Sequence, residues 1–135
     1  MENARPRHPQ AGAEVMSLFN LGQFTLHSGA QSPFKIDCDA LTDADLEALA
    51  QIGAQMVPLF GKVEGVPRGG LRLKAALDKY ADARWSQLLI VDDVLTTGGS
   101  MERQRNGRQA VGLVIFARGP CPSWVTPLFT FAEPQ

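Results

Sequence analysis

The sequence has little cysteine, no excess of charge and no long hydrophobic run. Its two cysteines, Cys38 and Cys121, are too few for a zinc site or a disulfide framework, and we interpret both as reduced thiols. Thirteen Lys and Arg against fourteen Asp and Glu give a net charge of −1, whereas nucleic-acid-binding domains carry a broad basic surface. No apolar run reaches the roughly 20 residues of a membrane-spanning helix, and the first residues lack the apolar core of a signal peptide. We therefore expect a cytoplasmic protein that binds neither nucleic acid nor a membrane.

The remaining composition is that of one globular domain. A chain of 135 residues with 44% hydrophobic residues can bury a core without disulfides or metals. Residues 1–13 contain two prolines and no apolar periodicity, which is typical of a flexible arm at a chain end. We expect a flexible N-terminal arm over 1–13 and a single domain over 14–135.

Apolar runs and amphipathic segments alternate along this domain. Strands are expected at 24–26, 34–37, 62–66, 88–91, 111–117 and 125–131. Helices are expected between the cap Thr42 and the stop Pro58, over 71–80, and over 101–109 with a break at Asn106-Gly107. Uninterrupted apolar runs such as 88–91 indicate strands that are buried on both faces. The alternation predicts an α/β fold with a parallel sheet flanked by helices.

Two adjacent acids, Asp92 and Asp93, follow directly on the apolar run at 88–91 and begin a polar, Gly-rich loop that is expected over 92–100. Parallel α/β sheets bind their ligands beyond the carboxyl ends of the strands, which is where these acids are expected. Neighbouring carboxylates repel each other unless cations or hydroxyl donors offset their charge. The hydroxyl groups of a sugar are such donors.

The rest of this loop is rich in glycine and hydroxyl groups. Gly98 and Gly99 allow a ligand to approach the backbone closely. Thr96, Thr97 and Ser100 supply hydroxyl donors, and the helix that follows can direct free N–H groups at the same anion. The loop has no lysine, so it is not a Walker-type P-loop. Together with the two acids, the loop predicts a ribose 5-phosphate site.

Every position of the stretch 88–100 matches a known signature: four apolar residues, two acids, two apolar residues and Thr-Thr-Gly-Gly-Ser. The stretch resembles the phosphoribosyl pyrophosphate (PRPP) motif of the type I phosphoribosyltransferases. The resemblance implies a Rossmann-like α/β fold and assigns a catalytic role to Asp92 and Asp93, which would hold the ribose hydroxyls. It assigns the binding of the 5-phosphate to Val94, Leu95, Thr96, Thr97, Gly98, Gly99 and Ser100.

A second match lies upstream, in the stretch Gly65-Val66-Pro67-Arg68-Gly69-Gly70-Leu71. This Gly-rich turn resembles the pyrophosphate loop of the same family. The resemblance implies that Arg68 and the N–H groups of Gly69 and Gly70 bind pyrophosphate, and that the bond Pro67–Arg68 is cis. Physically, a guanidinium beside a Gly-rich turn is suited to phosphate oxygens.

A third match narrows the family, because residues 19–34 resemble the N-terminal segment of orotate phosphoribosyltransferases, which closes over the pyrimidine base. Two positions depart from that pattern: His27 stands where a lysine is usual, and Lys35 stands where many members have a second aromatic residue. Lys35 either meets a substrate carboxylate or lies in solvent. The base-binding candidates are His27, Phe34, Lys35, Arg118 and Trp124. Trp124 either stacks on the base or caps the edge of the core.

The interval 71–87 is shorter than its counterpart in these enzymes, which also holds a strand and a mobile basic lid. The helix 71–80 leaves only Ala81–Gln87 before the next strand. The resemblance therefore implies a truncated, orotate phosphoribosyltransferase-like homodimer that uses Mg²⁺, held through PRPP rather than by direct protein ligands, to join PRPP and a pyrimidine base. Two alternatives remain: a non-catalytic PRPP- or nucleotide-binding regulatory protein without the lid, and an unrelated α/β domain.

Overall fold

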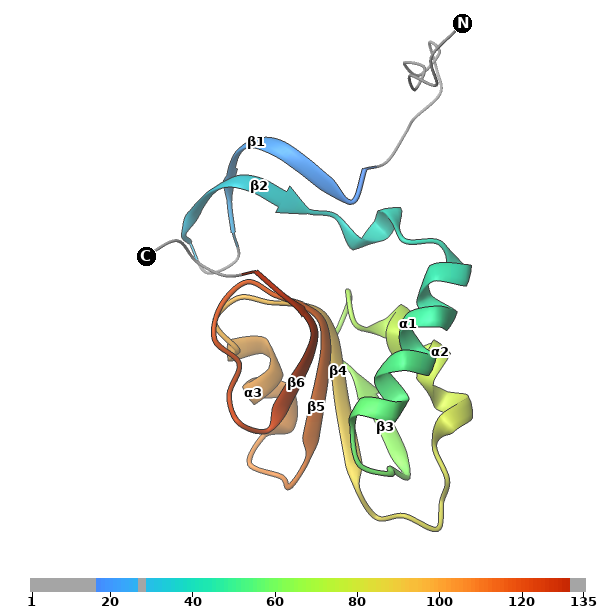
Figure 1. The fold of residues 1–135 in the computed structure, drawn as a ribbon. Helices are drawn as coiled ribbons and strands as arrows, with labels where there is room; N and C mark the ends of the chain where they lie inside the picture. The colour runs from blue at the N-terminus through green and yellow to red at the C-terminus, as the bar shows by residue number, and fades with distance from the viewer. Residues whose placement is uncertain (1–16, 27–28, 132–135) are drawn as a thin grey trace, which may run out of the picture.

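The fold was obtained as a computed structural model, which describes residues 17–26 and 29–131 (Figure 1). The predicted N-terminal arm and His27 lie outside these residues. The strands are β1 (Phe19–Thr25), β2 (Gln31–Ile36), β3 (Lys62–Gly65), β4 (Leu88–Leu95), β5 (Val111–Ala117) and β6 (Val125–Thr130). The helices are α1 (Asp43–Met56), α2 (Leu71–Leu77) and α3 (Gly99–Arg105), with 3₁₀ turns η1 (Cys38–Ala40) and η2 (Asp78–Tyr80).

A parallel sheet in the order β3-β4-β5-β6 forms the centre of the molecule. Helices α1 and α2 cover one face of it and α3 covers the other, as Figure 1 shows. The antiparallel hairpin β1-β2 lies across the carboxyl ends of the strands. The predicted α/β architecture, a parallel sheet flanked by helices, is confirmed.

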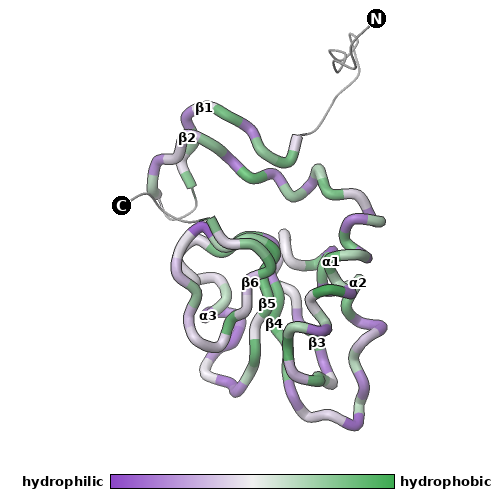
Figure 2. Tube along the Cα trace, viewed as in Figure 1, coloured by the Kyte–Doolittle hydropathy of each residue, from purple (hydrophilic) through white to green (hydrophobic). Residues whose placement is uncertain are grey.

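The core follows the hydrophobic pattern of the sequence. Figure 2 shows apolar residues concentrated along β4 and β5, whose side chains Leu89, Val91, Leu113 and Ile115 are fully buried or nearly so. A Cβ on Gly53 would lie 2.6 Å from Leu113 Cδ2, so this glycine allows α1 to pack closely on β5. Within the described ranges, no helix is long and apolar enough to cross a membrane.

The ends of α1 and α3 lie where local sequence signals place them. Thr42 caps α1: its Oγ1 accepts from the N–H of Asp45 (3.0 Å), and its own N–H donates to Asp45 Oδ2 (2.9 Å). This reciprocal pair is a capping box, which stabilises a helix start. Helix α3 ends at Arg105, and its cap Asn106 has a left-handed φ of 52°, so the predicted break at Asn106-Gly107 is confirmed, but the helix does not continue to 109 as expected.

The strand predicted at 88–91 extends further, and the expectation that Asp92 and Asp93 begin a loop is wrong. Strand β4 continues to Leu95 because β5 runs beside it in register, with Val94 opposite Phe116 and Leu95 opposite Ala117. Leu95 is buried and Val94 packs against the core, so their side chains support the sheet. The loop proper is limited to Thr96–Gly98.

The connection between η2 and β4 is as short as the sequence predicts. Residues Ala81–Gln87 contain no helix or strand. They pack against the start of β3: the N–H of Asp82 donates to the C=O of Phe60 (3.0 Å), and the N–H of Gly61 donates to the C=O of Gln87 (2.9 Å). No additional strand and no lid therefore lies between η2 and β4.

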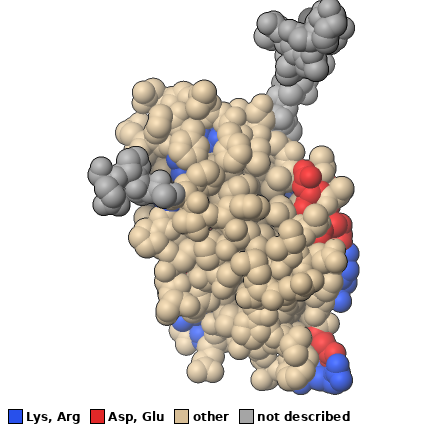
Figure 3. Space-filling model, viewed as in Figure 1, with Lys and Arg blue, Asp and Glu red and all other residues tan. Residues whose placement is uncertain are grey.

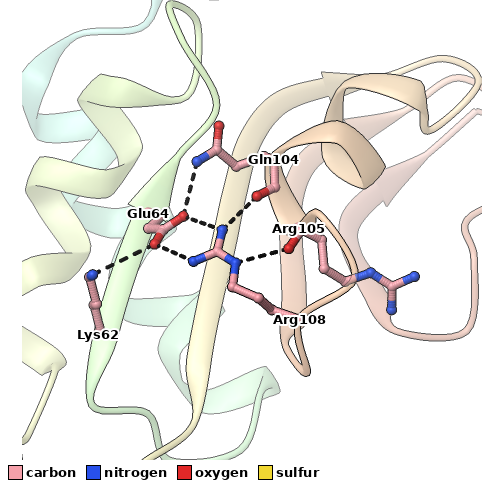
Figure 4. A network of polar contacts seen from close by, with 5 residues as sticks. All are labelled: Lys62, Glu64, Gln104, Arg105 and Arg108. Carbon is pink, nitrogen blue, oxygen red and sulfur yellow. Dashed lines mark hydrogen bonds and ion pairs between the residues drawn. The ribbon is translucent and has the colours of Figure 1, made fainter.

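A polar network centred on Glu64 ties β3 to the end of α3 (Figure 4). Nη1 and Nη2 of Arg108 donate to the two carboxylate oxygens of Glu64, each at 2.8 Å, and Gln104 Nε2 donates to Oε1 at 2.9 Å. Arg108 also donates to the C=O groups of Gln104 and Arg105. The hydrogen bonds from Arg108 outweigh burial and lower the pKa of Glu64 to about 2. The carboxylate therefore holds the loop after α3 across β4.

We expect Glu64→Gln to destabilise the fold by roughly 1–3 kcal/mol at pH 7, because the guanidinium loses its bidentate partner. Because folding lowers the pKa of Glu64, its carboxylate contributes fully to the free energy of unfolding above the ordinary glutamate pKa of about 4.3. This contribution is lost as the pH falls toward the pKa that Glu64 has in the folded protein. Urea unfolding at several pH values measures this. The difference between variant and wild type should shrink below pH 4.3, whereas Arg84→Gln, which removes an exposed pair with Asp82, should have little effect. A difference that stays constant down to pH 2 would contradict the interpretation.

Candidate active site at the carboxyl end of the sheet

The turn after β3 packs directly against the acids of β4. A Cβ on Gly69 would lie 2.3 Å from Asp93 Oδ2, and a Cβ on Gly70 would lie 2.5 Å from the C=O of Val91. The N–H of Val66 donates to the same C=O (2.9 Å). Two residues without side chains thus let the turn approach β4, which brings Arg68 to the end of the sheet that carries the acids.

The turn itself differs in one respect from the expectation. The peptide bond Pro67–Arg68 is cis, as the resemblance implies. The N–H of Gly70, however, donates to the C=O of Val66 (2.8 Å) because the backbone closes on itself there. Gly70 therefore gives the turn its shape, and the donors left for a ligand are Arg68 and the N–H of Gly69.

The two acids have different surroundings. Asp92 is 7% exposed, and its Oδ1 accepts from the N–H of Asp93 at 2.8 Å. Asp93 is less buried, and its Oδ1 accepts from the N–H of Val94 at 2.7 Å. Burial, followed by the neighbouring Asp93, raises the pKa of Asp92 well above that of an ordinary aspartate. A carboxyl that retains its proton can donate as well as accept, which suits the hydroxyl groups of a sugar.

The loop Thr96–Gly98 is supported from the next strand. The N–H of Arg118 donates to the C=O of Leu95 (2.8 Å), and a Cβ on Gly119 would lie 2.7 Å from the C=O of Thr96. Gly98 has a φ of 89°, a conformation that glycine adopts without strain. The loop thus turns sharply into α3, and Thr97 remains exposed at its tip.

Phe34 and Arg118, two of the base-binding candidates, come together under the hairpin. The Arg118 guanidinium lies 3.9 Å from the centre of the Phe34 ring, and Nη1 donates to the C=O of Phe34 (3.2 Å). Nη2 of Arg118 also donates to Oγ of the buried Ser32. Lys35 is exposed on β2.

Trp124 lies away from these two residues, against α3. Its Nε1 donates to Glu102 Oε2 (2.8 Å), and the Arg105 guanidinium lies 4.5 Å from its ring. The side chain also packs on the core cluster of Val114 and Met101. These contacts match the alternative in which Trp124 caps the edge of the core.

Sequence reasoning missed two residues near the site. Cys38 lines a small cleft with Gly69 and Asp93, and burial, followed by Asp93 and other nearby acids, raises the pKa of its thiol to about 12. Arg103 Nη2 donates to Ser100 Oγ (3.2 Å). The spacing of three residues on a helix is a signal for the second contact, whereas no local pattern indicates the first. Among the described residues, no three His, Cys, Asp or Glu side chains converge on a metal position.

The fold is similar to that of solved orotate phosphoribosyltransferases. The solved structures it resembles include the orotate phosphoribosyltransferase of Aeropyrum pernix, with a TM-score of 0.69, 24% identity, and coverage of 84% of this chain and 88% of that one. The enzyme of Francisella tularensis gives a TM-score of 0.59, 20% identity, and coverage of 84% and 80%. The orotate phosphoribosyltransferase of Mycobacterium tuberculosis H37Rv, in complex with Fe(III) dicitrate, gives a TM-score of 0.60 and 14% identity. The match covers 83% of this chain and 89% of that one. No protein-family model matches the sequence, and no curated protein matches it significantly.

We expect Gly69→Ala to destabilise the protein by roughly 1–3 kcal/mol, because the new methyl group collides with the Asp93 carboxylate. Asp93→Ala in the same chain removes the colliding oxygens, so the double variant should recover part of the loss. Urea unfolding of the wild type, both single variants and the double variant gives the coupling energy. Strictly additive effects would mean that Gly69 and Asp93 do not pack as described.

Proposed function

We propose that the protein binds PRPP and transfers its phosphoribosyl group to a nucleobase, orotate or a related pyrimidine, with release of pyrophosphate. The observation that best supports this is the packing of Gly69 against Asp93. It brings the pyrophosphate turn to the two acids, and the acids are joined to the 5-phosphate loop by the end of one strand. Three motifs that match one ligand thus meet at one end of the sheet.

In the proposed reaction a ring nitrogen of the base attacks C1 of the ribose, and the bond from C1 to pyrophosphate breaks. Asp92 and Asp93 hold the ribose hydroxyls and fix the ring. The loop around Thr96–Gly98 anchors the 5-phosphate, so binding energy far from C1 orients the reacting centre. Arg68 and the N–H of Gly69 receive the leaving pyrophosphate, whose charge grows as the bond breaks.

We propose Mg²⁺ as the ion that accompanies PRPP. Magnesium retains several waters and is held largely by substrate phosphates in such sites, which fits a site where the described residues offer no three converging ligands. When bound, it would neutralise charge on the pyrophosphate. Arg68, which forms no ion pair with any described residue, would hold the same group from the protein side.

A second candidate function is PRPP or nucleotide binding without turnover. The observation in its favour is the connector Ala81–Gln87, which leaves no lid to exclude water. Both candidates use the same phosphate-binding residues. They differ only in whether the bond at C1 is broken.

Pyrophosphate release distinguishes the two candidates. The protein is incubated with Mg²⁺, PRPP and a panel of bases that includes orotate, uracil and adenine, and PRPP binding is measured by calorimetry. We expect PRPP binding and pyrophosphate release with a pyrimidine, both weakened at least about tenfold in Asp92→Asn/Asp93→Asn. Binding without release from any base supports the second candidate. No PRPP binding at millimolar concentration overturns both.

We also propose that the protein acts as a cytoplasmic homodimer, whose interface is an uncharged surface formed by α1 and the residues that follow it. Residues 48–61 carry no charge, and Ile52, Met56 and Leu59 within them are exposed. Figure 3 shows a broad uncharged face in the view in which α1 lies at the front, with charged groups at its margins. Such a face can meet its own copy without like-charge repulsion.

We expect sedimentation equilibrium of the wild type to give twice the monomer mass. Met56→Lys should shift the equilibrium toward the monomer, because it places equal charges on facing copies. Arg105→Met, on α3 at the opposite face of the sheet, serves as the control and should leave the mass unchanged. A monomeric wild type at micromolar concentration would contradict the dimer.

A further inference from the structure

We propose that Arg103 binds the 5-phosphate of PRPP, while Arg68 binds its pyrophosphate at the other end of the molecule. This inference rests on the proposed function and adds a residue that the PRPP motif does not contain. It assigns to Arg103 the positive charge that the loop 96–100 lacks. The argument comes from charge pairing and from the geometry around Gly99.

Most cations of the described chain are already paired with acids. Ion pairs engage Lys62, Arg72, Lys74, Lys79, Arg84, Arg105 and Arg108. Arg68 and Arg103 have no such partner within the described residues. Arg68 belongs to the turn that contacts Asp93, and Arg103 belongs to the first turns after the phosphate loop. The cations left for an anionic ligand therefore include one on each of the two predicted phosphate-binding segments.

The side chain of Arg103 reaches back from α3 toward the loop. Its Nη2 donates to Ser100 Oγ at 3.2 Å, and its Nη1 lies 3.3 Å from the position of a Cβ on Gly99. A side chain at position 99 would therefore press on the guanidinium, so glycine leaves room for it there. Side chains on helices lean toward the N-terminus, which makes this reach an ordinary one.

This placement suits a phosphate group. A guanidinium carries five N–H donors, and one contact to a neutral hydroxyl leaves most of them available. Its planar fork can bind two phosphate oxygens at once, and such charge-assisted bonds are stronger than neutral ones. Thr97 on the loop and Ser100 in the first turn of α3 provide hydroxyl donors nearby. These donors suit a phosphate group such as the 5-phosphate of a ribose.

The division of roles makes the two arginines separable. Ribose 5-phosphate has the 5-phosphate but no pyrophosphate, whereas PRPP has both. Loss of Arg103 should therefore affect both ligands by the same factor. Loss of Arg68 should affect PRPP alone. If the Arg103 guanidinium contacts only its own helix, its loss should change the affinity for neither ligand.

Calorimetry with ribose 5-phosphate and with PRPP and Mg²⁺ tests this on the full chain. We expect Arg103→Gln to weaken both ligands about tenfold or more, as the loss of charge-assisted hydrogen bonds implies. Arg103→Lys keeps the charge without the fork and should lie between Arg103→Gln and the wild type. Arg68→Gln should weaken only PRPP. Arg84→Gln removes an arginine that pairs with Asp82, and it should leave both affinities unchanged.

Each result has a definite meaning. Wild-type affinity for ribose 5-phosphate in folded Arg103→Gln, with a wild type that binds it, overturns this inference and leaves the proposed function standing. Weakening of PRPP alone in Arg103→Gln also overturns it, because the arginine would then serve the pyrophosphate. A wild type that binds PRPP but not ribose 5-phosphate contradicts an independent 5-phosphate site. A wild type that binds neither ligand overturns the proposed function itself.

Discussion

The contact between the backbone of Gly69 and the carboxylate of Asp93 is the constraint on which the site depends. It exists only because position 69 has no side chain and because β3 and β4 are neighbours in a parallel sheet. Parallel neighbours end at the same edge, so the turn after β3 and the acids of β4 meet without a further element. The same sheet carries Arg118 at the end of β5, whose N–H supports the strand just before the phosphate loop. Adjacent strand ends thus provide the acids, the turn and the support of the loop.

Local signals in the sequence were enough for much of this. The cap Thr42, the apolar run of β5 and the break at Asn106-Gly107 depend on residues close together in the chain, and all were predicted. The end of β4 was not predicted, because it depends on the register with β5, a strand more than twenty residues further along the chain. The contacts of Arg118 with Ser32 and Phe34 were not predicted either, because they join segments that are distant in the sequence. The use of the Gly70 N–H within its own turn is a matter of backbone geometry that residue types do not reveal.

Aromatic side chains and the guanidinium of Arg118 hold the hairpin β1-β2 against the end of the parallel sheet. Phe19 and Phe34 contact Phe131, and Phe19 also meets the ring of Phe116 edge-on. Arg118 adds hydrogen bonds to the hairpin that apolar contacts cannot replace. The segment that resembles the base-covering part of the orotate enzymes is therefore anchored at the carboxyl end of β5, beside the strand that bears the acids.

The short connector between η2 and β4 affects more than the site. With no further strand inserted there, β3 is the outermost strand in the order β3-β4-β5-β6, and an outermost strand can recruit strands from other molecules. Here it is only four residues long and carries Lys62 and Glu64. A short edge strand with charged side chains is a feature that discourages pairing with strands of other molecules.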